Sequence, residues 1–184
     1  MRNTIAALVR TIQPLDTLEQ EHLDTTLAWI ASGAPLFRVA KPATPPQHLV
    51  AYFVLVDPTR KKLVLVDHKL AGLWLPGGGH VEPDEHPQAT VLREANEELE
   101  IHANFLLDEP LFLTVTETVG ATAGHTDVSL WYVLCGNSTQ QLRFDEHEFH
   151  TIRWFAFDAL PFERADPHLA RFMAKLYSHL EENF

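Results

Sequence analysis

The segment from Gly79 to Ile101 constrains this chain more strongly than any other part of its sequence. It reads GHVEPDEHPQATVLREANEELEI, a glycine turn and a short polar loop followed by a run rich in helix formers. Glu94, Glu97 and Glu98 stand at i, i+3 and i+4, so a helix would place them on one face. Like charges at this spacing destabilise an isolated helix by roughly a few tenths of a kcal/mol per pair. A bound hard cation would reverse that effect, so the segment indicates a helix face suited to a metal ion.

The rest of this helix is expected to be anchored on a core. Leu92, Ala95 and Leu99 are predicted to form an apolar face opposite the glutamates. Asp84 or Glu85 is predicted to cap the N-terminus of the helix.

The spacing of the segment resembles the signature of the Nudix hydrolases, G-x5-E-x7-R-E-U-x-E-E-x-G-U, in which U is an apolar residue. Every polar position of that signature is matched, and the two apolar positions are occupied by a small alanine and by an isoleucine: Gly79, Glu85, Arg93, Glu94, Ala95, Glu97, Glu98 and Ile101. The chain is thus identified as a MutT-like member of the family. The approach to the signature, His68 to Leu75, is similar to the HKxxGxWL of a group of Nudix proteins that carry an N-terminal helical extension.

Two positions depart from the family pattern. Glu100 stands where the family usually has glycine, and a left-handed backbone at a residue with a Cβ costs on the order of 1 kcal/mol. Pro76 precedes three glycines instead of two, so it stands one place earlier than usual. Neither departure removes a proposed ligand.

The order of the predicted elements favours an α/β (α+β) sandwich. A helix is expected over residues 17–32, capped by Thr17 with Gln20, and a second, C-terminal helix over residues 168–180. Strands are expected at residues 48–57, 62–67, 104–107, 111–117, 127–134 and 151–157. The resemblance makes this a Nudix-type α/β/α sandwich with a mixed sheet and the signature helix packed against it. Residues 1–45 are predicted to be an N-terminal helical extension and connector, and residues 46–184 the Nudix hydrolase domain with its C-terminal helix.

Composition limits the class of partner. The formal net charge of −11 argues against broad binding to nucleic acid or to an anionic membrane, but it does not exclude a nucleotide bridged by a metal ion. No apolar run approaches membrane-spanning length, so the cytoplasm is the expected location. Cys135, the only cysteine, follows an apolar run and is interpreted as a core residue. No Cys/His spacing indicates zinc.

The resemblance implies a metal site for Mg²⁺, with Mn²⁺ as a substitute. Glu94, Glu97 and Glu98 would be its ligands, together with the backbone carbonyl of Gly78. Arg93 would hold a signature glutamate through a charge-assisted hydrogen bond, or else form a surface pair with Glu97. Glu85 would be structural or a distal ligand.

The general base is left open between several carboxylates. Some Nudix enzymes use the glutamate at the Glu94 position, and others use one on a loop before the last strand. That loop contains Glu146 and Glu148 here, and Glu148 fits the family's recurrent acidic position better. A solvated acidic loop is the alternative interpretation.

Four further side chains are candidates for substrate contacts. His80, His125 and Asp127 would reach phosphate or base, although each is also a common kind of surface residue. Trp74 would stack on a nucleobase, with a role in the core as the alternative.

The function implied by the resemblance is Mg²⁺-dependent cleavage of a phosphoanhydride bond in a nucleoside diphosphate linked to another moiety. The alternative is a catalytically silent Nudix module that binds and senses a nucleotide. The sequence does not identify the substrate, and it leaves a homodimer open.

Overall fold

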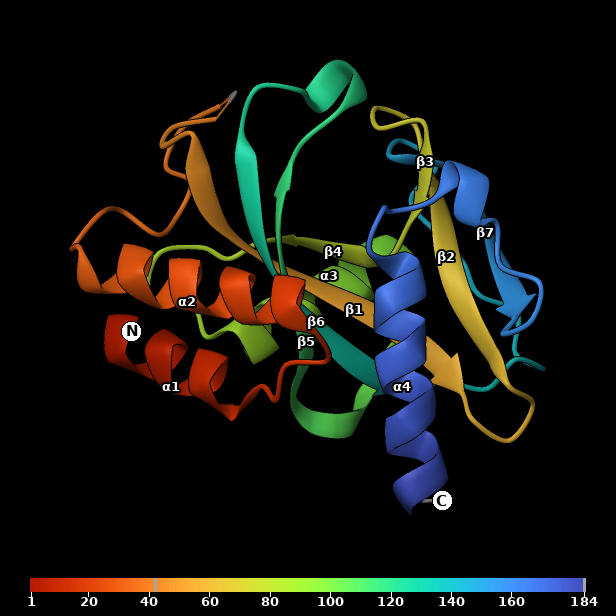
Figure 1. Ribbon diagram of the computed structural model, residues 1–184. Helices are drawn as coiled ribbons and strands as arrows, with labels where there is room; N and C mark the ends of the chain where they lie inside the picture. The colour runs from red at the N-terminus through yellow and green to blue at the C-terminus, as the bar shows by residue number, and fades with distance from the viewer. Residues whose placement is uncertain (42, 184) are drawn as a thin grey trace.

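A seven-stranded mixed sheet forms the centre of the protein (Figure 1). The computed structural model describes residues 1–41 and 43–183, and Pro42, in the predicted connector, lies outside them. The helices are α1 (Arg2–Thr11), α2 (Thr17–Ala31), α3 (Pro87–Leu99) and α4 (Leu169–Asn183). The strands are β1 (Gln47–Asp57), β2 (Lys62–His68), β3 (Leu73–Leu75), β4 (Gly77–His80), β5 (Asn104–Glu117), β6 (Thr126–Cys135) and β7 (Phe149–Ala156). Two 3₁₀ turns cover Gly120–Thr122 and Phe162–Arg164.

The strands follow the order β3-β2-β1-β6-β5, with β4 paired to β1 and β7 paired to β2. β1 and β6 are parallel, and the other pairs are antiparallel, so the sheet is mixed as predicted. The two predicted segments 104–107 and 111–117 form the single strand β5, whose register is interrupted between Phe105 and Phe112. The register between β1 and β6 sets His48 opposite Asp127, which matters for the cavity described below.

The long central strand β1 carries apolar side chains on both faces, because helices cover both sides of the sheet. Leu49, Ala51 and Phe53 pack into a core with residues of α1, α2 and α3. Val54 and Val56 pack on the other side with residues of α4. In Figure 1, α4 crosses the near face of the sheet and α3 lies behind it. The predicted three-layer sandwich is therefore confirmed.

Helix α2 covers β5, the last strand in the order of the sheet. The backbone N–H of Leu113 donates to the buried carboxylate of Glu19, and Lys175 of α4 donates to the same oxygen at 2.5 Å. A strand edge left open would expose unpaired N–H groups, so this contact protects β5.

Asp16 caps α2 by accepting from the N–H of Glu19 at 2.8 Å. The predicted cap, Thr17 with Gln20, was one residue too late.

Several other local expectations were wrong. Residues 2–11, which carry little sequence signal, form α1, because Ile5 and Val9 are buried only once the core is assembled. Cys135 is exposed at the end of β6 and is not a core residue. The side chain of His86, not Asp84 or Glu85, caps α3 by accepting from the N–H of Gln88.

In the described part of the chain, no helix has the length and apolarity needed to cross a membrane.

The apolar face of α3 is shifted by one residue from the predicted one. Ala95 and Leu99 are buried as expected, but Leu92 is 41% exposed and Val91 takes its place in the core. The helix ends at Glu100, whose φ of 51° is left-handed, so the position that is glycine in the family does need positive φ. The left-handed backbone at Glu100 therefore costs about 1 kcal/mol relative to a glycine at this position.

Candidate active site

A cavity of about 1130 Å³ lies where β1, β4, α3 and several loops meet. Its lining includes most of the candidate residues named from the sequence: Gly78, His80, Arg93, Glu94, Glu97, Glu98, His125, Asp127 and Glu148. The tertiary structure thus gathers side chains that are up to 70 positions apart in the chain, from Gly78 to Glu148. Pockets that bind small molecules commonly have volumes of roughly 300–1,000 Å³, so this cavity has room for a nucleotide-sized ligand.

The glycines of β4 allow the carboxylates of α3 to approach the backbone. A Cβ on Gly79 would overlap the carboxylate of Glu94, and a Cβ on Gly77 would lie 2.7 Å from a carboxylate oxygen of Glu98. Gly78 has a φ of 137°, which only glycine adopts readily, and its N–H donates to Glu98 at 2.9 Å. The glycine run therefore serves to bring the acidic helix face against the sheet.

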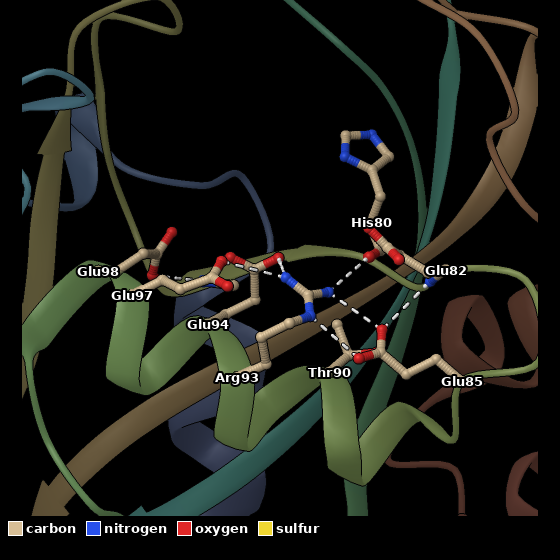
Figure 2. A network of polar contacts seen from close by, with 9 residues as sticks. His80, Glu82, Glu85, Thr90, Arg93, Glu94, Glu97 and Glu98 are labelled. Carbon is tan, nitrogen blue, oxygen red and sulfur yellow. Dashed lines mark hydrogen bonds and ion pairs between the residues drawn. The ribbon is translucent and has the colours of Figure 1, made fainter.

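Arg93 connects the carboxylates around the start of the cavity (Figure 2). Its Nε and Nη2 donate to the two oxygens of Glu85, each at 3.0 Å, and its Nη1 donates to Glu94 at 2.7 Å and to Glu97 at 3.2 Å. Nη2 also donates to the backbone carbonyl of His80 at 3.3 Å. Both interpretations from the sequence therefore apply, because Arg93 pairs with Glu97 and also holds Glu94.

The pKa values of Glu85, Glu94 and Glu98 are shifted in different directions. The paired guanidinium of Arg93 lowers the pKa of Glu85 to about 2. Burial raises the pKa of Glu98 well above its ordinary value, and the charge of Glu94 raises it further. Burial also raises the pKa of Glu94, against the hydrogen bond from Arg93. The partners of Glu85 thus favour its ionised form, whereas burial disfavours the ionised forms of Glu94 and Glu98.

This donor set fits a divalent cation. The box formed by Glu85, Glu94, Glu97 and Glu98 holds four carboxylates against one guanidinium, Arg93. Glu98 is only 5% exposed, so water screens its charge poorly. Carboxylate oxygens are the ligands that Mg²⁺ prefers, and an added cation would supply the missing positive charge.

Of the two glutamates on the loop before β7, Glu148 is the one that lines the cavity. Its negative charge raises the pKa of Glu94 and of Glu98, so it lies within electrostatic reach of both. The backbone carbonyl of Glu146 accepts a hydrogen bond from Lys69. This geometry favours Glu148 over Glu146 as the base.

Trp74 lies in the core and does not line the cavity. It is 9% exposed, packs edge-to-face on Phe155 at a centroid distance of 4.9 Å and carries the guanidinium of Arg164 over its ring. Its position matches the alternative given above, a core tryptophan at a strand end. Trp74 is therefore not placed to stack on a nucleobase in this cavity.

His80 and His125 lie in one cluster with Asp127 and with His48, a residue that sequence reasoning missed. His48 and His80 have ring centroids 4.6 Å apart, and His48 and His125 stack at 4.9 Å. Burial, together with the positive charge of Arg38, lowers the pKa of His80 to about 3. Because His48 stands 32 residues before His80 in the chain, no local spacing reveals the group.

Comparison with known proteins agrees with this architecture. A family model described as the NUDIX domain matches residues 46–176. None of the curated proteins compared with the sequence is a significant match. Among solved structures, the chain is similar to a MutT Nudix hydrolase from Burkholderia pseudomallei, with 25% identity, a TM-score of 0.52 and coverage of 75% of this chain and 98% of the other.

Two other solved structures show the same fold at lower identity. The MutT protein from Methanosarcina mazei has a TM-score of 0.60 and 17% identity, with coverage of 73% of this chain and 95% of the other. An Ap4A hydrolase from C. elegans has a TM-score of 0.54 and 16% identity, with coverage of 72% and 98%. The domain match spans more than half of the chain and includes the complete acidic box, and we conclude that this protein belongs to the Nudix family of hydrolases.

Proposed function

We propose that this protein is a Mg²⁺-dependent pyrophosphohydrolase that cleaves a nucleoside diphosphate linked to another moiety, X. The observation that carries the proposal is the pair of carboxylates Glu94, which is partly buried, and Glu98, which is buried. Both line a nucleotide-sized cavity and have raised pKa values. Anions that are costly to bury in the isolated protein are well suited to a site that is completed by a cation. Among the similar structures, the C. elegans protein is named for hydrolysis of Ap4A, a substrate with a chain of phosphates.

Glu94, Glu97 and Glu98 would hold the ion, with the backbone of Gly78 beside them. When bound, Mg²⁺ supplies charge neutralisation on the phosphates and lowers the pKa of water. Mn²⁺ would substitute, because it also accepts oxygen ligands.

The protein residues would position the reactants and move a proton. Arg93 holds Glu94 and Glu97 by hydrogen bonds, which fixes the acidic face before a substrate arrives. Glu148 would accept a proton from the attacking water, since it faces the cavity from outside the acidic helix. The water oxygen would join one phosphorus as the bridging P–O bond breaks. The products would be a nucleoside monophosphate and phosphorylated X, or pyrophosphate when the substrate is a nucleoside triphosphate.

We also propose a domain division and a location. Residues 1–45 would be an extension that packs on the core, and residues 46–184 would be the hydrolase domain. The contribution of Ile5, Val9 and Leu23 to the main core supports an extension that does not fold separately. The location would be cytoplasmic, and the partner would be a small phosphate-containing molecule, not a nucleic acid.

The test is a hydrolysis screen with Mg²⁺ and with Mn²⁺. The panel would contain nucleoside triphosphates, ADP-ribose, dinucleoside polyphosphates, nucleotide sugars and coenzyme A, with release of phosphate or nucleoside monophosphate as the readout. Glu98→Gln would be compared with Glu181→Gln, an exposed change on α4. The proposed enzymatic activity would be refuted if wild type and Glu98→Gln released product at the same background rate from every compound. A thermal shift with nucleotide in that case would indicate the silent binding module.

A further inference from the structure

A second candidate metal site lies beside the acidic box, on a different set of strands. His48 is the second residue of β1, His80 ends β4, His125 directly precedes β6, and Asp127 is the second residue of β6. Each of these side chains offers one ligand atom, and the four atoms lie within 4.8 Å of one another. We call this group the histidine cluster. Figure 2 shows the imidazole of His80 directed away from the carboxylates around Arg93, so the two groups of residues are separate.

The hydrogen-bond partner of one ring nitrogen assigns the tautomer of His48. Its Nδ1 lies 3.0 Å from the backbone carbonyl of Pro45, and a carbonyl only accepts, so Nδ1 carries the hydrogen. In the neutral ring, Nε2 is then left with a lone pair. This atom lies 3.1 Å from Oδ1 of Asp127, yet neither atom makes a hydrogen bond, and the side chain of His48 is 0% exposed.

His125 has the same arrangement. The hydroxyl oxygen of Thr118 lies 3.2 Å from Nδ1 of His125, and the hydroxyl also donates to the carbonyl of His125 at 3.1 Å and accepts from its backbone N–H at 3.4 Å; we assign the tautomer in which Nδ1–H donates to Thr118. Nε2 of His125 then directs its lone pair towards Oδ1 of Asp127, 3.3 Å away. Nε2 of His80 is also buried and makes no hydrogen bond.

Ring nitrogens of three histidines and a carboxylate oxygen of Asp127 therefore lie close together around one small volume, an arrangement that a metal cation would satisfy. Two ligands of a tetrahedral ion with bonds of about 2.0–2.1 Å lie roughly 3.3–3.4 Å apart, close to the distances of 3.1 and 3.3 Å from Asp127 to His48 and His125. Imidazole suits zinc and its neighbours in the transition series, whereas Mg²⁺ prefers oxygen ligands. We propose that the histidine cluster binds a divalent transition metal ion of the zinc class.

The surroundings of the cluster support this assignment. Metal-binding histidines usually donate their other ring N–H to a carbonyl or similar acceptor, as His48 does to Pro45 and His125 does to Thr118. Four protein ligands would fill a tetrahedral ion, which is the pattern of structural zinc sites. The ion would join β1, β4 and β6. It would also steady the backbone of His80, whose carbonyl accepts from Arg93 at 3.3 Å.

The test measures metal content directly and does not depend on finding a substrate. Wild-type protein would be stripped with a chelator, exposed to Zn²⁺ or Co²⁺ in the presence of excess Mg²⁺, and freed of unbound metal. Bound zinc would be counted by mass spectrometry, and the visible spectrum of bound Co²⁺ would report tetrahedral geometry. The variants are His125→Ala and the near-isosteric Asp127→Asn. The matched control is His150→Ala, an exposed histidine of β7.

We expect one zinc ion per chain in wild type and in His150→Ala, and an affinity reduced roughly 10–100-fold or more in the two cluster variants. Glu98→Gln should retain its zinc, which distinguishes this cluster from the acidic box even if no hydrolysis is found. The proposal is overturned if stripped wild type binds no zinc or cobalt. It is equally overturned if zinc binding survives in both cluster variants or is lost in Glu98→Gln.

Discussion

Arg93 binds the carboxylate of Glu85 through two parallel hydrogen bonds, each 3.0 Å long, from Nε and Nη2. This contact ties the loop before α3 to the middle of the helix, and the remaining Nη1 holds Glu94 and Glu97. A planar guanidinium can serve all of these acceptors at once, which an ammonium group cannot.

Replacing Arg93 with lysine should reduce turnover roughly 10–100-fold while leaving the protein folded, because the lysine cannot hold Glu85, Glu94 and Glu97 together. The measurement is kcat and KM on the substrate found in the screen, with thermal unfolding as a check. Arg143→Lys is the matched control, since its pair with Glu100 is exposed on both sides. An unchanged kcat in Arg93→Lys would show that Glu85, Glu94 and Glu97 keep their positions without the guanidinium group of Arg93.

Glu85 should stabilise the protein above pH 4.5 and lose this contribution in acid. Its pKa falls from 4.5 in the unfolded chain to about 2 in the native protein, so the unfolded state binds more protons in this window. Stability should therefore decline as pH falls from 4.5 through 2, and less steeply in Glu85→Gln. Denaturant unfolding across this range checks the slope, and parallel curves would contradict the prediction.

Glu98 should have the opposite effect on stability. Its native pKa is raised above 4.5, so the native state holds the proton more tightly and stability falls as pH rises above that value. In the presence of a chelator at pH 8, Glu98→Gln should be more stable than wild type by on the order of 1 kcal/mol, or roughly 2–4 °C in Tm. Saturating Mg²⁺ should reverse the ranking, because only wild type retains the full ligand set. A less stable Glu98→Gln in the chelator would show that the buried charge is compensated within the protein.

Glu148→Gln should lower kcat by about 10²–10⁴-fold with a smaller effect on KM, as expected for loss of a general base. Glu146→Gln on the same loop is the control and should retain most of the activity. The pH profile should lose its acidic limb in Glu148→Gln only. If Glu146→Gln is the variant that is inactive, the assignment of the base must be exchanged.

Glu100→Gly should stabilise the protein by about 0.5–1 kcal/mol relative to Glu100→Ala. Alanine keeps the Cβ in the left-handed conformation at φ 51°, whereas glycine relieves it. Both variants lose the exposed pair with Arg143, so their difference isolates the backbone term. Chemical denaturation of the two variants gives the comparison, and equal stability would show that the turn carries no strain.

Local patterns predicted the elements whose own residues specify them. The strands expected at residues 48–57 and 62–67 and the helix expected over residues 168–180 formed close to their predicted bounds, as β1, β2 and α4. Helix α1 was missed, although its ten residues carry an apolar stripe that includes Ile5, Leu8 and Val9 and is buried in the assembled protein. Leu92 was misplaced by one position because the helix is rotated to bring Glu98 against Gly78.

By itself, the sequence determined the acidic face of α3, since Glu94, Glu97 and Glu98 stand within one turn and a half of a single helix and their spacing is independent of the rest of the fold. It also determined the family and the mixed sheet. Tertiary structure alone decided that Glu148 faces that box, that Trp74 belongs to the core, and that His48 meets Asp127. The physical reason is that strand register sets these neighbours: β1 and β6 are parallel partners separated by about 80 positions in the chain, and no short-range pattern records such a pairing.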